Sequence, residues 1–464
     1  MKLDRRSSLI VCALFCLLAL SLQSAAQQTP ANPSPPQSPT ASQTPSTPQA
    51  QPAPPPSEPD FKCPRAADPR RRTRECNDHD FGLDETLENR WDYVRSALKH
   101  IGIVPTASYV GVLQTNAAGG SHNVWTYAGL LSFGLSTDFS ELLRIPGLSA
   151  YVGASWGTGG NLAGSLNSII PTNSIYAPSI YLGEMYLQER LFENKLTLLA
   201  GRLAAGNGFA ALPVFTNYVT WGINPNPISL GLNDATFYGP PPGSQWGAQA
   251  TYSVIPALQI GAGIFNNNLN SAYGADHGTD FALQEGNKGA LTIVEADYLI
   301  HQRASSKHKP GQISVGFLHN GNSFTALNNV AVRTEGYNAT FVMAQQMIYR
   351  PGGPGTTQGA TLWGTYTFNS KEFVSPVPQS WSAGASYEGL IPARNKDIVS
   401  LAVIRTEGSK YGPSFNTEGL VELNYQWFHS QYLAIAPHAQ YLWRNDNLPA
   451  RNILVLGVQF SLTL

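Results

Sequence analysis

Apolar and polar residues alternate along the segment 452–464. One parity is apolar, with Leu454, Leu456, Val458, Phe460, Leu462 and Leu464, and the other carries Gly457, Gln459, Ser461 and Thr463. Because alternate side chains of a strand point to opposite faces, the segment predicts a strand with one apolar and one polar face. A terminal strand is left unpaired unless the sheet closes on itself, so the pattern favours a closed β-barrel with its apolar face toward lipid.

The same period of two begins near Thr106 and recurs along the rest of the chain. It predicts an all-β fold, a transmembrane antiparallel β-barrel of about 16 strands. The segments with strand character are 106–115, 125–138, 147–157, 179–190, 195–203, 245–254, 257–266, 289–300, 311–319, 336–349, 358–369, 380–389, 396–406, 417–428, 431–443 and 452–464. The first of these strands is expected to pair with the last and close the barrel.

The connections between these segments alternate in length. Those around 145–147, 193–194, 256, 301–310, 351–357, 391–396 and 429 are short, whereas about 22 residues follow Trp156, about 40 follow Leu203 and about 23 follow Asn266. Bacterial barrels have short periplasmic turns and longer external loops. We therefore expect both chain ends of the barrel to lie in the periplasm.

Composition supports a barrel over a helical membrane protein. Charged residues make up only 13% of the 464 residues, yet the hydrophobic content is 42% and the mean hydropathy is −0.16. Beyond the N-terminus the sequence contains no apolar run of the roughly 20 residues that a spanning helix needs. The net charge of −1 gives no indication of nucleic-acid binding.

Four regions are expected along the chain. Residues 1–26 combine a basic start, a short apolar run and small residues at their end, which predicts an export signal peptide. Residues 27–60 are rich in Pro, Ser, Thr, Gln and Ala and predict a disordered linker, of a kind that fits contact with peptidoglycan or another envelope component. Residues 61–104 form a periplasmic N-terminal segment, and residues 105–464 form the outer-membrane barrel.

The periplasmic segment contains a predicted helix. Apolar residues recur at spacings of three and four across 84–101, at Leu87, Trp91, Val94, Leu98 and Ile101. This spacing predicts an amphipathic helix that packs at the periplasmic end of the barrel.

Cys63 and Cys76 lie in the same segment and are the only cysteines after the signal peptide. In an oxidising exported compartment a disulfide between them is favoured. Their spacing, with no second pair nearby, is a weak indication of zinc, so we expect no metal site.

The longest external loop, about 204–244, is too long and too apolar to extend freely into water. We expect it to fold into the lumen and narrow it, as a constriction with aromatic rings and polar edges that suits sugars. The candidate residues along the permeant path are inward-parity polar residues, Arg202 at the loop's entrance, Arg405 near a strand end and two loop aromatics: Glu184, Tyr186, Gln188, Arg202, Phe209, Trp221, Glu295, Asp297, Glu388, Arg405, Glu422, Gln440 and Arg444.

Several motifs resemble the OprB-type carbohydrate-selective porin family. The segments 387–397 (Y-E-G-L-I-P-A-R-N-K-D) and 422–425 (E-L-N-Y) are the most specific matches, and 184–201 is similar to the family's segment before its constriction loop. Ala393 stands where the family's turn usually has Gly. The resemblance runs from about residue 84 to the end, and it implies passive, sugar-preferring diffusion.

The sequence thus predicts an outer-membrane porin of a diderm bacterium that passes small sugars through a loop-narrowed lumen, without a cofactor. Its expected partners are small sugars and outer-membrane lipid. Alternative functions are a general, non-specific porin and, with less support, a barrel enzyme or an envelope anchor. A membrane-barrel enzyme would need Ser, His and acid residues that converge, and the sequence contains no nucleophile motif that suggests such a site.

Overall fold

The computed structural model describes residues 91, 94–120, 122–175, 180–234, 244–267, 277–279, 281, 289–303, 305–412, 417–444 and 452–464. The predicted signal peptide, the Pro-rich linker, the Cys63–Cys76 disulfide and the first half of the predicted helix lie outside these residues. The chain is helical at Trp91 and at 94–99, but Val94 is 45% exposed and Ile101 is 50% exposed. The apolar face expected for this helix is therefore only partly covered by the described residues.

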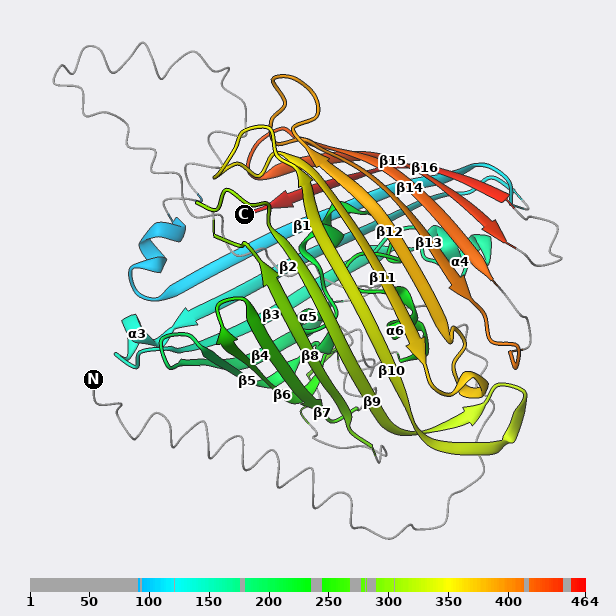
Figure 1. Cartoon of the computed structure of the whole chain (residues 1–464), viewed down its shortest axis with the longest axis horizontal. Coiled ribbons are helices and arrows are strands. Elements are labelled where there is room, and N and C mark those ends of the chain that lie inside the picture. Colours follow the sequence, from blue (N-terminus) through cyan, green and yellow to red (C-terminus); the bar gives the residue numbers. More distant parts are fainter. Residues whose placement is uncertain are drawn as a thin grey trace, which may run out of the picture.

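Sixteen antiparallel strands of the described residues close into a barrel, as the sequence predicts (Figure 1). They are β1 (Ile103–Ala118), β2 (Trp125–Asp138), β3 (Leu148–Gly159), β4 (Ile180–Leu191), β5 (Leu196–Leu203), β6 (Gln245–Ile255), β7 (Leu258–Phe265), β8 (Leu291–Ile300), β9 (Gly311–Ala326), β10 (Asn329–Tyr349), β11 (Gly359–Asn369), β12 (Gln379–Glu388), β13 (Ile398–Glu407), β14 (Glu418–Phe428), β15 (Leu433–Arg444) and β16 (Asn452–Thr463). The short helices that follow are α3 (Phe139–Leu142), α4 (Leu162–Leu166), α5 (Ala205–Gly208), η1 (Pro213–Asn217), α6 (Ile228–Asn233) and η2 (Glu372–Val374).

Closure occurs between β1 and β16, which confirms the expected partner of the last strand. The register pairs Ser108 with Thr463 and continues to the pair of Ala118 and Leu454. Next to Ser108 and Thr463, the neighbouring residues Ala107 and Leu464 exchange backbone hydrogen bonds of 3.2 and 2.7 Å. The backbone N–H and C=O groups that the two edge strands of a flat sheet would expose are therefore paired.

The hairpin of β9 and β10 is longer than the sequence predicts. The two strands were expected to meet near 319 and 336, but they continue to Ala326 and Asn329. Packing of Phe324 on Tyr337, with ring centroids 4.9 Å apart, stabilises this extension. Bulges between Glu335 and Tyr337 break the period of two there, which explains why the sequence pattern ended early.

The outward face of the barrel is apolar along its middle. Side chains such as Phe133, Val152, Phe317, Leu401 and Leu423 are 39–53% exposed, and they alternate with inward residues along each strand. This is the alternation expected of a wall between lipid and lumen. None of the helices that the described residues form is long and apolar enough to cross a membrane.

The turn between β12 and β13 is held by a carboxylate. Asp397, only 3% exposed, accepts hydrogen bonds from the Tyr425 hydroxyl, from Arg394 Nε at 2.7 Å and from the Phe428 N–H at 3.1 Å. In the same turn Ala393 has a φ of 65°, in the left-handed region that favours glycine. These bonds join the two segments whose sequences resemble the porin family most specifically.

We expect Asp397→Asn to destabilise the protein at neutral pH and much less in acid. Burial alone would raise the pKa of Asp397, but the bonds from Tyr425, Arg394 and Phe428 outweigh it and hold the pKa below its usual range. A folded-state pKa below the unfolded value stabilises the fold above the unfolded pKa, and this contribution disappears as pH falls through the folded pKa. Thermal unfolding midpoints should differ by a few degrees at pH 7, and the difference should shrink as the pH falls below the usual carboxyl range; an equal difference at every pH would contradict this role.

Candidate functional site

The long connection between β5 and β6 folds inside the barrel, as the sequence predicts. Its described residues, 204–234 and 244, include α5, η1 and α6 and are mostly buried (Figure 1). Phe215, Ile223 and Ile228 are each 1% exposed and belong to one apolar cluster with inward side chains of the wall such as Leu203. The loop is therefore a packed layer against the wall, and hydrophobic burial contributes to holding it there.

Glu422 on β14 is the strongest polar anchor of this loop. Its Oε1 accepts hydrogen bonds from the Val219 N–H at 2.8 Å and from Asn424 Nδ2 at 2.7 Å. Its Oε2 accepts bonds from the Thr220 N–H at 2.8 Å and from Gln440 Nε2 at 2.9 Å. The side chain is fully buried, so these four donors offset the cost of removing its charge from water.

Two further carboxylates hold the beginning of the loop. Glu184 on β4 accepts bonds from the Ala204 N–H at 2.9 Å and from Asn207 Nδ2 at 2.8 Å. Glu295 on β8 accepts one from the Ala210 N–H at 2.7 Å. Carboxylates on three strands of the wall, β4, β8 and β14, thus accept hydrogen bonds from backbone N–H groups of the same loop.

The aromatic rings of the loop pack against the wall. Phe209 is 3% exposed; it lies over the inward glycines Gly261 and Gly263 and meets Phe265 edge to face at 6.5 Å. Trp221 is 2% exposed. A Cβ atom at Gly263 would come within 2.8 Å of the Phe209 ring, and one at Gly261 within 3.1 Å, so both inward positions leave little room beside this ring. Phe209 and Trp221 therefore belong to the interface between loop and wall.

A second loop, between β3 and β4, also folds inward, and the sequence reasoning missed it. The Thr172 hydroxyl and Asn173 Nδ2 each donate to Gln114 Oε1 on β1 at 2.8 Å. Leu162 and Ile170 of this loop are fully buried in the same apolar cluster as the long loop. Apolar residues in a supposed external loop were the signal that could have revealed it.

An ion pair fixes this second loop to the wall. Arg444 on β15 donates from Nε to Glu418 Oε2 at 2.8 Å and from Nη2 to the Leu166 carbonyl at 2.7 Å. Glu418 on β14 also accepts bonds from the Ser168 hydroxyl, from the Ile169 N–H at 3.3 Å and from the Ile170 N–H at 2.8 Å. The two charged side chains are 1% and 5% exposed, so the pair is buried.

The two inward loops are joined to each other. The Thr220 hydroxyl of the long loop donates to the Pro171 carbonyl of the second loop at 2.8 Å. Gln440 Nε2 donates both to the Thr172 carbonyl at 2.7 Å and to Glu422 Oε2 at 2.9 Å. A single polar network thus holds both loops against β14 and β15.

Arg202 does not face the constriction. Its strand position is directly opposite Met185 and Trp246, which are on the outward parity, and its Nη1 donates to the Gly278 carbonyl of the connection between β7 and β8. Directly opposed residues of antiparallel strands point to the same face. Since Arg202 is fully buried, the Gly278 segment covers it on the outer side of the barrel.

Arg405 is also on the outward face, so its assignment to the lumen was wrong. It pairs with Trp381, which is 40% exposed on the outer surface, and with Gly419. Its place near the end of β13 is where a long cationic side chain reaches the polar headgroup region.

Besides Glu184, which binds the long loop, four predicted residues face the lumen and keep partial exposure: Tyr186, Gln188, Asp297 and Glu388. The Tyr186 ring lies 5.3 Å from that of Tyr151 between centroids and also packs against the apolar cluster shared by the loops and the wall. The Gln188 carboxamide lies beside the Arg190 guanidinium. Asp297 Oδ1 accepts a bond from Gln312 Nε2 at 3.2 Å, and Glu388 Oε1 accepts one from the Thr357 hydroxyl at 2.5 Å. The polar contacts of Gln188, Asp297 and Glu388 involve no residue of the described parts of the inward loops. Among the described residues, no group of three or more His, Cys, Asp or Glu side chains could hold a metal ion.

The family model for the carbohydrate-selective porins, OprB family, matches residues 122–464. The chain belongs to this family. A comparison with curated proteins gives no significant match. The resemblance of its motifs to this family is therefore confirmed over the whole barrel from β2 onward.

Two solved structures of Pseudomonas putida OprB share the fold. The high-pH structure has a TM-score of 0.73 at 20% identity, covering 81% of this chain and 97% of that one. The low-pH structure has a TM-score of 0.54 at 18% identity, covering 82% and 98%. At these identities the likeness concerns the fold.

Membership makes this OprB-family protein a carbohydrate-selective porin of the Gram-negative outer membrane, and not an enzyme. Carbohydrates are the permeants that the family implies. In such barrels the short turns are periplasmic. The turn between β12 and β13, and the end of β16 with Leu464, then lie on the periplasmic side, and α4 lies on the external side (Figure 1).

Proposed function

We propose that small sugars cross this porin by passive diffusion past a constriction that both inward loops form. The observation that carries the proposal is the buried network of Glu418, Glu422, Gln440 and Arg444, which holds the two loops inside the barrel. A fixed constriction needs such anchors, because a loop held only by flexible contacts would fluctuate across the path.

The predicted site residues other than Arg202 and Arg405 then take two roles. Glu184, Glu295, Glu422, Gln440 and Arg444 position the loops, and Phe209 and Trp221 pack them against the wall. Tyr186, Gln188, Asp297 and Glu388 are the candidates for contact with the permeant, because they face inward and keep partial exposure. The apolar outward face contacts outer-membrane lipid, and contact of residues 27–60 with peptidoglycan or another envelope component stays a prediction.

Liposome swelling and planar-bilayer conductance test the proposed function. Liposomes that contain the pure protein should swell in isotonic monosaccharide faster than in a disaccharide or a larger oligosaccharide, because a constriction discriminates by size. Sugar should also reduce the ion current reversibly as it enters the lumen. Liposomes that stay unswollen in every sugar, together with an unchanged ion current, would rule out sugar diffusion.

A further inference from the structure

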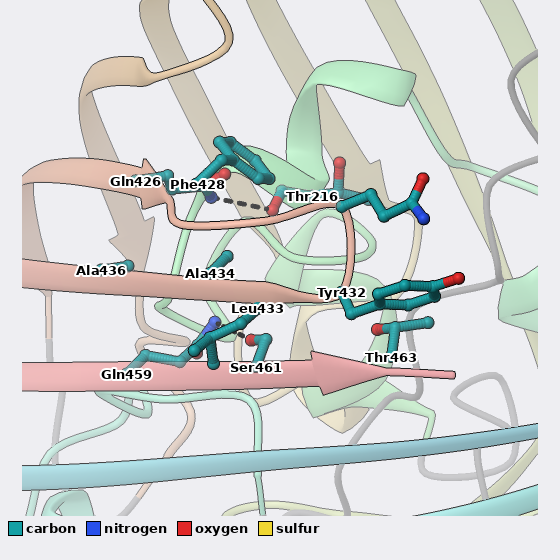
Figure 2. Close-up of a pocket in the computed structure, with 11 residues that line it drawn as sticks. Thr216, Gln426, Phe428, Tyr432, Leu433, Ala434, Ala436, Gln459, Ser461 and Thr463 are labelled. Carbon is teal, nitrogen blue, oxygen red and sulfur yellow. Dashed lines mark hydrogen bonds between the residues drawn. The ribbon is translucent and has the colours of Figure 1, made fainter. Parts of the chain in front are cut away.

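A cavity of about 190 Å³ lies at the periplasmic end of the lumen, between the tip of the long loop and the wall (Figure 2). The wall side is formed by inward residues of β14, β15 and β16, including Gln426, Phe428, Gln459 and Ser461. The loop side is formed by Thr216 at the end of η1. The cavity is smaller than the roughly 300–1,000 Å³ of sites for drug-sized ligands, so it suits a smaller molecule such as one sugar ring.

The lining chemistry is polar but uncharged. None of the eleven lining residues is Asp, Glu, Lys, Arg or His, and the polar groups are amides and hydroxyls beside the rings of Phe428 and Tyr432. Gln426 Nε2 reaches the Thr216 carbonyl at 3.4 Å and Gln459 Nε2 reaches the Ser461 hydroxyl at 3.5 Å, both at the long limit of a hydrogen bond. Each carboxamide also has a second N–H and an acceptor oxygen, so both have capacity for a ligand's hydroxyls.

The loop tip that forms one side of the cavity is held in place from three directions. The Asn217 carbonyl accepts a bond from Asn424 Nδ2 at 2.9 Å, and the Val214 N–H donates to Gln345 Oε1 at 3.2 Å. The Phe215 ring packs edge to face on Trp363 at 5.3 Å. The cavity is therefore preformed, and a ligand would not have to order the loop in order to bind.

We propose that this cavity is a sugar subsite at the periplasmic exit of the channel, on the periplasmic side of the long loop and selective for one uncharged monosaccharide ring. The carboxamides of Gln426 and Gln459 and the Ser461 hydroxyl bind the ring hydroxyls, and the rings of Phe428 and Tyr432 line the apolar side. A sugar phosphate or sugar acid is disfavoured, because no cation in the lining offsets its desolvation. The subsite rests on the proposed function, since it acts on sugars that have already passed the loops.

The test is sugar-induced noise in the current through single channels, with glucose added on the periplasmic side. Gln459→Ala combined with Ser461→Ala should weaken glucose binding from that side about tenfold, the expected loss for two neutral hydrogen bonds. The conductance in salt alone should stay unchanged. Ser461→Ala alone, with about a threefold effect, keeps the test possible if the double variant does not fold.

Gln259→Ala is the matched control. Gln259 faces inward on β7 near the same end of the barrel, and its Nε2 reaches a serine hydroxyl, that of Ser253, at 3.4 Å, but it does not line the cavity. It should leave glucose binding unchanged, and glucose 6-phosphate should bind the native channel more weakly than glucose from this side. Native glucose noise that persists unaltered in both cavity variants, or that weakens equally in Gln259→Ala, would overturn the subsite while leaving sugar diffusion intact. A native channel without any glucose effect on current or liposome swelling would overturn both proposals.

Discussion

Glu422→Gln should release the long loop although it changes the side chain by one atom. In either orientation of the amide, the new NH2 group faces two donors: Val219 N–H and Asn424 Nδ2, or Thr220 N–H and Gln440 Nε2. Hydrogen bonds to a charged acceptor contribute about 1.5–3 kcal/mol each. Losing two of them shifts the equilibrium between docked and released loop by a factor of about one hundred or more.

The expected result is a noisier channel with higher-conductance substates and weaker discrimination between small and large sugars, measured in planar bilayers and by liposome swelling. The barrel itself should still fold, because the wall is held by its own strand pairs. Glu388→Gln is the matched control for current noise and conductance substates, since Glu388 faces the same lumen but accepts a bond only from the Thr357 hydroxyl in its described contacts. Quiet, native-like currents in Glu422→Gln would show that Glu422 does not hold the loop.

The fold could be predicted because lipid imposes a strict rule on the wall. Outward residues of β16, from Leu454 to Leu462, had to be apolar, and that requirement repeats on every strand. The rule weakens where the inner face is also covered. On β5, Leu198 and Leu199 are apolar on both parities because the inner one packs against the long loop, so the direction of Arg202 could not be read from the pattern.

The assignment of Arg405 to the lumen was wrong for a different reason, because the sequence pattern does show on which face of its strand it lies. Val399, Leu401 and Val403 form the outward face of β13, and Arg405 continues the same parity. The residue was assigned by its charge, whereas its position near the strand end allows a charged side chain on the outer surface. To predict whether a charged residue faces lipid or lumen, its distance from the end of the strand therefore has to be considered together with its parity.

The roles of the inward polar residues could not be predicted from the sequence. Glu422 and Glu388 have the same parity and chemistry, yet the first binds a loop more than two hundred residues earlier and the second a neighbouring turn. The family motifs become intelligible only in the fold. In the segment 422–425, Glu422 holds Thr220, and Tyr425 bonds to Asp397 of the other motif.

The buried pair of Glu418 and Arg444 should respond asymmetrically to the loss of either partner. After Arg444→Met, Glu418 keeps its hydrogen bonds from the three donors of residues 168–170. After Glu418→Leu, the described contacts leave Arg444 with the Leu166 carbonyl alone. An uncompensated buried charge costs about 3–5 kcal/mol, so Glu418→Leu should approach that value and Arg444→Met should cost clearly less.

Urea unfolding in detergent, followed by tryptophan fluorescence, measures both variants and the double variant Glu418→Leu/Arg444→Met. The double variant should be more stable than Glu418→Leu alone, because it removes the stranded guanidinium and replaces it with an apolar side chain. In planar bilayers both variants that lack Glu418 should show added current noise from the second loop, which loses its acceptor for the N–H groups of Ile169 and Ile170. Equal destabilisation by the two single variants would mean that the backbone N–H groups contribute little and that the ion pair alone carries the interaction.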